Sequence, residues 1–125
     1  MSDKTREELL AAGGHKDDTS KVRMELLPPE MLWETAKVLT FGAKKYADRN
    51  YEHGMDWGRV FGALQRHLWA WWGGEDRDAE TGYLHLSHAS CCVAMLLVYV
   101  VRGIGKDTRS TSDEDIPHPS KLPPR

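Results

Sequence analysis

Side chains that could do chemistry are most concentrated between residues 74 and 88. Four carboxylates fall within six residues, and two histidines follow them, one helical turn apart: Glu75, Asp76, Asp78, Glu80, His85 and His88. Carboxylates this close repel one another, so a cation or full solvation must compensate them. Such oxygen ligands suit Mg²⁺ or Mn²⁺, and Mg²⁺ is commonly held by a few carboxylates together with substrate phosphates. An acidic, solvated helix start that interacts with the helix dipole is the alternative, and the spacing leaves both open.

The two histidines favour a metal or catalytic role for this segment. At 100° per residue, Asp78, His85 and His88 share one face of a predicted helix. Histidines spaced i, i+3 can bind a metal, and with Cys92 they even permit a zinc site. They can also act as a general base or orient a ligand. The alternative is that Asp78 is only an N-cap and that the histidines donate to neighbouring groups.

Glu34 is a second candidate metal ligand. It lies opposite the main apolar face of its predicted helix, yet its neighbours there are Val38 and Phe41. We therefore expect Glu34 to be partly buried, and a buried carboxylate needs a partner, which a metal would supply. An ion pair with Lys37 at i+3, or with a basic residue of another helix, is the alternative.

Basic and aromatic residues could complete a nucleotide site. They lie before the first predicted helix, at its C-terminal end and on the second helix: Arg23, Lys44, Lys45, Tyr46, Asn50, Arg66 and His67. Cations there would neutralise phosphate charge, although lysines at a helix C-terminus also interact with its dipole. The sequence contains no P-loop, GxGxxG or Ser/His/Asp nucleophile pattern. Cys91 and Cys92 lie in an apolar run that disfavours the thiolate, so cysteine chemistry is not expected.

Three helices are predicted to position these residues, with no strand. The first begins at Pro28-Pro29 and ends near Tyr46, because proline suits the first helical turn. The second is capped by Asp56 and ends at Trp72, before two glycines. The third begins near Asp78 and ends near Arg102. The sequence thus predicts an all-α fold, a bundle of three main helices per chain.

The C-terminal half of the third predicted helix is apolar on all sides and must be covered on all sides. Three helices cannot easily do this alone, so we expect a homodimer or homotetramer to complete the bundle. The apolar run 89–101 is shorter than the ~20 residues that a membrane span needs. It predicts a deeply buried helix and no membrane association.

Composition bounds the remaining possibilities. The chain has 125 residues and a net charge of −2, so we expect one domain and no binding to a nucleic-acid polymer. Residues 1–20 are predicted to form a flexible arm, 21–105 the folded domain and 106–125 a disordered tail. Two adjacent cysteines cannot staple a secreted scaffold, so a cytoplasmic location is expected.

In their order along about residues 17–101, these motifs resemble a MazG-like (MazZ-like) family of phage dATP/dGTP diphosphohydrolases, in the all-α NTP pyrophosphohydrolase superfamily. The resemblance rests on 21–28, 42–46 with Asn50, 66–68, and 74–89. It implies an oligomeric helical enzyme that uses Mg²⁺ or Mn²⁺ to release pyrophosphate from purine deoxynucleoside triphosphates. It also implies a host cytoplasm location and a product, dGMP, that can feed a phage modified-purine pathway.

The chain departs from the general MazG pattern of Glu-x-x-Glu on the first helix and Glu-x-x-Asp on a later one. Lys37 follows Glu34 at i+3, and the later positions are His85 and His88. The metal shell is therefore predicted from Glu34, Glu75, Asp78 and Glu80, with His85 and His88 as catalytic groups. A non-catalytic nucleotide-binding regulatory subunit and a dimeric phage interaction protein are the alternatives.

Overall fold

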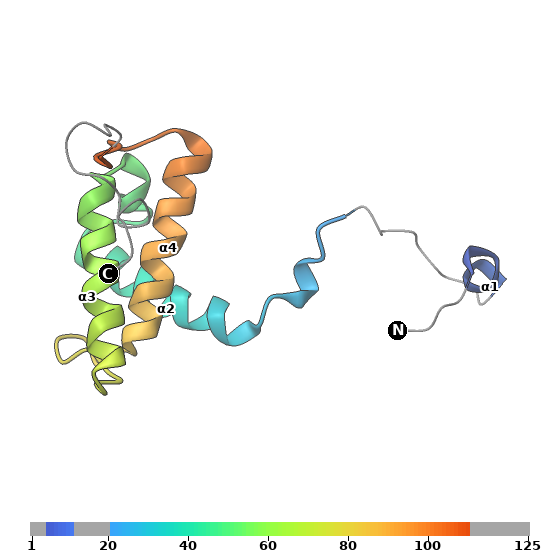
Figure 1. Ribbon diagram of the computed structural model, residues 1–125, viewed down its shortest axis with the longest axis horizontal. Helices are drawn as coiled ribbons and strands as arrows, with labels where there is room; N and C mark the ends of the chain where they lie inside the picture. The colour runs from blue at the N-terminus through green and yellow to red at the C-terminus, as the bar shows by residue number, and fades with distance from the viewer. Residues whose placement is uncertain (1–4, 12–20, 111–125) are drawn as a thin grey trace, which may run out of the picture.

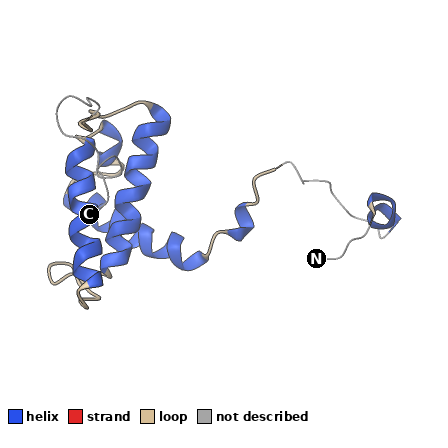
Figure 2. Cartoon of the chain, viewed as in Figure 1, coloured by secondary structure: helices blue, strands red, loops and turns tan. Residues whose placement is uncertain are grey.

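The computed structural model describes residues 5–11 and 21–110, and its regular elements there are helices (Figure 2). They are α1 (Arg6–Ala11), η1 (Met24–Leu26), α2 (Pro29–Lys45), η2 (Asn50–His53), α3 (Trp57–Trp72) and α4 (His85–Arg102). The prediction of an all-α fold with three main helices is confirmed. Most of the predicted arm and of the predicted tail, residues 1–4, 12–20 and 111–125, lies outside the described residues.

The central element is α4, which packs against both α2 and α3, while α2 and α3 barely contact each other (Figure 1). The core around it is small, and its buried apolar residues are Val60, Ala89, Cys91 and Tyr99. Tyr99 is fully buried, and its hydroxyl donates to the backbone oxygen of Tyr51 at 2.7 Å. This bond holds the C-terminal half of α4 against η2, which lies between α2 and α3 in the sequence.

The ends of α2 and α3 lie close to where the sequence predicts them. Pro29 starts α2 in the first-turn position that proline tolerates, and Gly73 ends α3. Asp56 is the N-cap residue of α3, but its side chain makes no capping hydrogen bond, so the predicted cap is wrong in its chemistry. The N–H of Trp57 donates instead to the backbone oxygen of Lys106, at 2.9 Å.

Residues 106–110, which begin the predicted tail, pack against the start of α3. The N–H of Gly58 donates to the Thr108 hydroxyl at 2.8 Å, and the Arg109 guanidinium lies 4.9 Å from the Trp57 ring centre. Arg109 also pairs with Asp107 and lowers the pKa of that carboxyl to about 2. These contacts bind the described part of this segment to the helical body.

The predicted start of the third helix at Asp78 is wrong, because α4 begins only at His85. Residues 78–84 form a turn instead. The N–H of Asp78 donates to the backbone oxygen of Tyr83, and Arg77 and Leu84 form an isolated bridge. Gly82 has a φ of +76°, a left-handed conformation that glycine adopts at no steric cost. Asp78 is therefore not the N-cap of α4.

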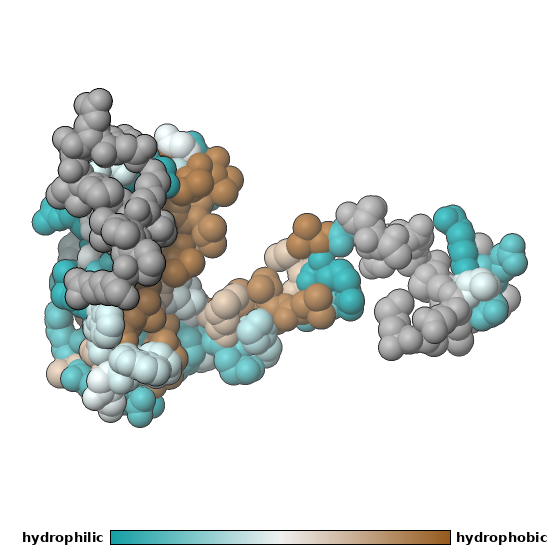
Figure 3. Space-filling model, viewed as in Figure 1, coloured by the Kyte–Doolittle hydropathy of each residue, from teal (hydrophilic) through white to brown (hydrophobic). Residues whose placement is uncertain are grey.

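The prediction that the third helix is deeply buried is also wrong for a single chain. Four apolar residues between its middle and its C-terminal end are exposed: Val93, Leu97, Val100 and Val101. Apolar side chains are also exposed on the segment that runs from η1 into α2, which projects from the bundle (Figures 1 and 3). By length and composition alone α4 could cross a membrane, and 33% of that stretch is buried inside the chain.

Candidate active site

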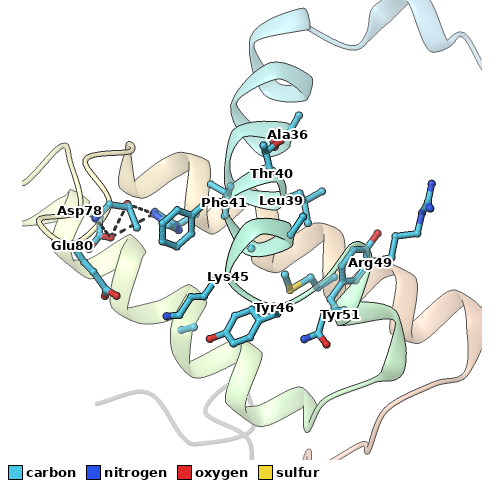
Figure 4. A pocket seen from close by; sticks show the side chains of 18 of the residues that line it. Ala36, Leu39, Thr40, Phe41, Lys45, Tyr46, Arg49, Tyr51, Asp78 and Glu80 are labelled. Atoms are coloured by element: carbon cyan, nitrogen blue, oxygen red, sulfur yellow. Dashed lines mark hydrogen bonds and ion pairs between the residues drawn. The ribbon is translucent and has the colours of Figure 1, made fainter.

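A cavity of about 1130 Å³ opens between the C-terminal half of α2, the loop after it, α3 and the 78–88 segment (Figure 4). It is lined by nine of the residues that the sequence assigns to a site: Lys45, Tyr46, Asn50, Arg66, His67, Asp78, Glu80, His85 and His88. The side chains of Lys45 and Glu80 extend into the space between α2 and the 74–84 loop (Figure 4). Packing therefore brings together residues from four separate parts of the sequence.

Four of the predicted site residues do not line this cavity: Arg23, Glu34, Lys44 and Glu75. Arg23 lies before α2 and pairs with Glu25 at 2.6 Å. Glu34 pairs with Lys37 at 2.6 Å and accepts a hydrogen bond from Ser87 of α4 at 2.9 Å. These two partners hold the pKa of Glu34 below its ordinary value. The contact with Lys37 is the alternative that the sequence left open for this carboxylate.

Asp78, Thr81 and His88 form one hydrogen-bonded cluster at the cavity wall. The Thr81 hydroxyl donates to Asp78 Oδ2 at 2.8 Å and lies 2.7 Å from His88 Nε2. Because the hydroxyl proton is used on Asp78, His88 Nε2–H must donate to the Thr81 oxygen. Burial raises the pKa of Asp78, but the hydrogen bonds from Thr81 outweigh it and hold that pKa below its ordinary value. Asp78 is thus kept as a carboxylate and His88 in one tautomer.

A second chain of contacts links Glu75, His85 and His67. His85 is only 5% exposed at the start of α4, and its Nε2 lies 2.9 Å from Glu75 Oε1. Its Nδ1 lies 2.9 Å from Nδ1 of His67 on α3. Both nitrogens of His85 are therefore engaged by other side chains, and the buried ring joins the acidic loop to α3.

His67 stands between the two clusters. Its ring is stacked on that of His88, with centroids 4.5 Å apart and planes 6° apart. Burial lowers the pKa of His67, and the neighbouring His88 and His85 lower it further. Burial also lowers the pKa of His88, against the opposing effect of Asp78. Both rings therefore favour the neutral form that can accept a proton.

Thr81 was not among the predicted site residues. The signal that could have found it is the order Asp78-x-x-Thr81-Gly82, typical of a turn in which aspartate accepts bonds from its own loop. The aromatic and apolar lining, Phe41, Tyr51 and Met95, was not predicted either. These three residues lie on different elements, so only the packing of α2 and α4 reveals them.

The described residues do not contain a preformed metal cage. In ranges 5–11 and 21–110, no group of three or more His, Cys, Asp or Glu side chains is close enough to hold an ion. Asp78 and Glu80 nevertheless line the same cavity as Lys45 and Arg66. Two carboxylates with room beside them suit an ion that completes its shell with phosphate and water.

Fold and cavity together define an all-α protein with a site that combines cations, carboxylates and neutral histidines, a set suited to phosphate chemistry. A model of the family described as "dATP/dGTP diphosphohydrolase, N-terminal" matches residues 11–109. The chain therefore belongs to this family, and the resemblance inferred from its motifs is confirmed.

One relative is a protein of Salmonella phage PMBT28 named "dATP/dGTP diphosphohydrolase". It is 32% identical over 101 residues, a match that covers 81% of this chain and 32% of the relative. The chain thus spans about a third of the length of the curated relative that it matches. No solved structure matches the chain.

Proposed function

We propose that this chain binds purine deoxynucleoside triphosphates and hydrolyses them to the monophosphate and pyrophosphate. The observation that carries the proposal is one cavity in which cations and carboxylates face the same space, in a chain of the diphosphohydrolase family. Its volume, about 1130 Å³, is ample for a nucleotide, since small-molecule sites range from about 300 to 1,000 Å³.

The polyphosphate would lie toward Lys45 and Arg66. The two cations line the cavity from α2 and α3. Hydrolysis between the α and β phosphates develops negative charge on the leaving pyrophosphate, and fixed cations beside that charge stabilise it. Lys45 also lies 5.4 Å from the ring centre of Tyr46, so the phosphate end adjoins an aromatic surface.

The purine would lie against the apolar side of the cavity. Phe41, Tyr46, Tyr51 and Met95 supply flat or polarizable surfaces, and Asn50 supplies an amide with both donors and an acceptor. A purine presents a large apolar face and a polar edge, so it gains more from such a wall than a pyrimidine does. This contrast supports a preference for dATP and dGTP, as the name of the phage relative states for that protein.

A divalent cation, Mg²⁺ or Mn²⁺, would enter together with the nucleotide. Asp78 and Glu80 would hold it, with phosphate oxygens and water as its other ligands. When bound, such an ion neutralises phosphate charge and acidifies water. Glu34 and Glu75 are predicted as further ligands from the sequence, and they stay predictions, because neither lines the cavity and each already has a partner, Lys37 for Glu34 and His85 for Glu75.

The test is a product assay with each of the four deoxynucleoside triphosphates, with Mg²⁺ and with Mn²⁺, read by ion-exchange chromatography. We expect pyrophosphate and monophosphate from dATP and dGTP. Lys45→Met should lower turnover about a hundredfold, the typical loss for one charge-stabilising group. Lys106→Met removes a lysine that does not line the cavity and should leave turnover unchanged. Nucleotide binding without any turnover would overturn the enzyme proposal in favour of a regulatory subunit.

We further propose that the chain forms homo-oligomers in the cytoplasm, without membrane association. The exposed face of α4 and the projecting segment before α2 are both apolar, and a second copy offers each surface to the other. The polar start of α4 is hydrogen-bonded to other parts of the chain through His85, Ser87 and His88, which supports a core helix. Light scattering of the wild type should give the mass of a dimer or tetramer. Leu97→Lys on α4 should dissociate this oligomer, whereas Gln65→Lys on α3 should leave it intact. A monomeric wild type would refute this arrangement.

A further inference from the structure

The two Nδ1 atoms of His67 and His85 point at each other, 2.9 Å apart. Two ring nitrogens can form a hydrogen bond only if one of them carries the proton and the other offers its lone pair. Which one carries the proton is set by the opposite nitrogen of His85, since that nitrogen contacts Glu75 at 2.9 Å. An ionised carboxylate only accepts hydrogen bonds, so His85 Nε2 must be protonated.

The positions of the other protons in this series of hydrogen bonds follow when each ring carries a single proton. With its proton on Nε2, His85 offers a lone pair at Nδ1. His67 must then carry its proton on Nδ1 and donate it to His85. The lone pair of His67 therefore lies on Nε2, the nitrogen farthest from the backbone.

His67 Nε2 is open to solvent. Among the described residues it has no hydrogen-bond partner, and no buried side-chain nitrogen or oxygen there lacks one. Because His67 is not an exposed residue, an unpartnered nitrogen of its ring must reach solvent. The residue lines the cavity together with Lys45 and Arg66. Of the other two histidines that line the cavity, His85 has both nitrogens bonded, and His88, with its Nε2–H on Thr81, keeps a lone pair only at Nδ1, the nitrogen nearer the backbone.

We propose that His67 is the general base of the hydrolysis and that Glu75, acting through buried His85, is the positioning residue that fixes its tautomer. The inference rests on the proposed function. As the water oxygen forms its bond to the α phosphorus, its O–H bond breaks and the proton passes to His67 Nε2. The bond from this phosphorus to the bridging oxygen breaks, and its electron pair leaves with pyrophosphate.

The positive charge that develops on His67 is compensated through its hydrogen bond to His85 and the contact of His85 with Glu75. Protonated His67 donates more strongly from Nδ1 to His85, and the Glu75 carboxylate stabilises the charge through the second ring. The arrangement resembles the way in which a carboxylate orients a catalytic imidazole in hydrolases. The lowered pKa of His67, caused first by burial, keeps the ring able to accept a proton near neutral pH.

The first test needs no variant and no turnover. A long-range nitrogen–proton NMR correlation spectrum of histidine-labelled wild type, at neutral pH without nucleotide, reports the tautomer of each ring. We expect His67 protonated on Nδ1 and His85 on Nε2. A His67 ring protonated on Nε2 would overturn the proposal, whatever the catalytic result.

The second test separates positioning from structure. Glu75→Gln, whose amide can donate as well as accept, should mix the His67 tautomers and lower kcat at least tenfold with KM within about twofold. His67→Gln should lower kcat by about 10² to 10⁴, the range for a lost general base. Glu30→Gln, at the exposed start of α2, is the matched control and should match wild type.

Unchanged kcat in Glu75→Gln with an unchanged His67 tautomer would refute the positioning role. Wild-type turnover is measured first with all four deoxynucleoside triphosphates. If none is hydrolysed, the proposed function fails and the catalytic role of His67 fails with it. The tautomers of the wild type still decide separately whether Glu75 and His85 orient the ring.

Discussion

The Thr81 hydroxyl joins the 78–84 turn to α4 through its bonds to Asp78 and His88, and Thr81→Val tests how much these bonds stabilise the fold. The substitution keeps the shape of the side chain and removes the hydroxyl's bonds to Asp78 and His88, together with the longer bond, at 3.3 Å, that it accepts from the Tyr83 N–H. A hydrogen bond to a charged group contributes about 1.5 to 3 kcal/mol, and one between neutral groups about 0.5 to 1.5 kcal/mol. The Asp78 side chain is 20% exposed to solvent, so a water molecule can partly replace the lost donor. We therefore expect the free energy of unfolding to fall by about 2 kcal/mol.

Urea unfolding, followed by tryptophan fluorescence in metal-free buffer, measures this loss. Thr40→Val is the matched control, because the Thr40 hydroxyl bonds only to the backbone oxygen of Ala36 on an exposed helix surface. The control should change the free energy of unfolding by less than about 0.5 kcal/mol, as exposed substitutions usually do. Equal losses in the two variants would refute the role of Thr81.

The pH dependence of the same measurement has a definite sign. The folded-state pKa of Asp78 is depressed, so its contribution to stability is present above the unfolded-state pKa and is lost as the pH falls through the folded-state value. The difference between wild type and Thr81→Val should therefore be largest at neutral pH and shrink in acid. A difference that stays constant down to the acid limit would show that Thr81 acts by packing and not through the carboxylate.

Three further predictions follow from the fold. Gly54→Ala should destabilise the fold by about 1 to 3 kcal/mol, because φ is +92° and a Cβ would lie 2.8 Å from the backbone nitrogen of Gly105. Gly42→Ala, in α2 with open space around it, should stabilise the fold by about 0.5 to 1 kcal/mol. Urea unfolding that gives both changes the same sign would contradict this. The Cys91 thiol, whose pKa burial raises to about 12, should react with a disulfide reagent at mildly alkaline pH only after unfolding. Tyr99→Phe should cost about 1 to 2 kcal/mol in thermal unfolding, since it leaves the Tyr51 carbonyl without its donor.

The helices could be predicted from the sequence where local chemistry marks their ends. Pro29 and Gly73 are such marks, and both ends lie where they were expected. The start of α4 could not be found this way, because the helical spacing of Asp78, His85 and His88 continues back through a segment that folds as a turn. The bonds that make the turn run between Asp78, Thr81 and Tyr83, and they outweigh the helical period.

The composition of the site could be predicted more fully than its internal roles. Types of residue and their order placed cations, carboxylates and histidines in one region, and nine of these residues line one cavity. From the sequence, His67 is predicted to bind substrate together with Arg66, beside the tryptophans of the second helix. Its partner His85 lies 18 residues away on another helix, so the pairing appears only when α3 packs against α4. Glu34 likewise finds Ser87 across α2 and α4, a contact that no local spacing encodes.

The central place of α4 has a consequence for synthesis of the protein. On the ribosome, α2 and α3 emerge first, yet they barely contact each other and have little to pack against. Until α4 follows, the nascent chain presents apolar helix surface that has no partner, such as Val60 of α3, which is buried in the folded chain; chaperones bind such surface, and it can aggregate. The bundle and its cavity can form only after residue 102 has left the exit tunnel, so chain elongation itself sets when the site appears.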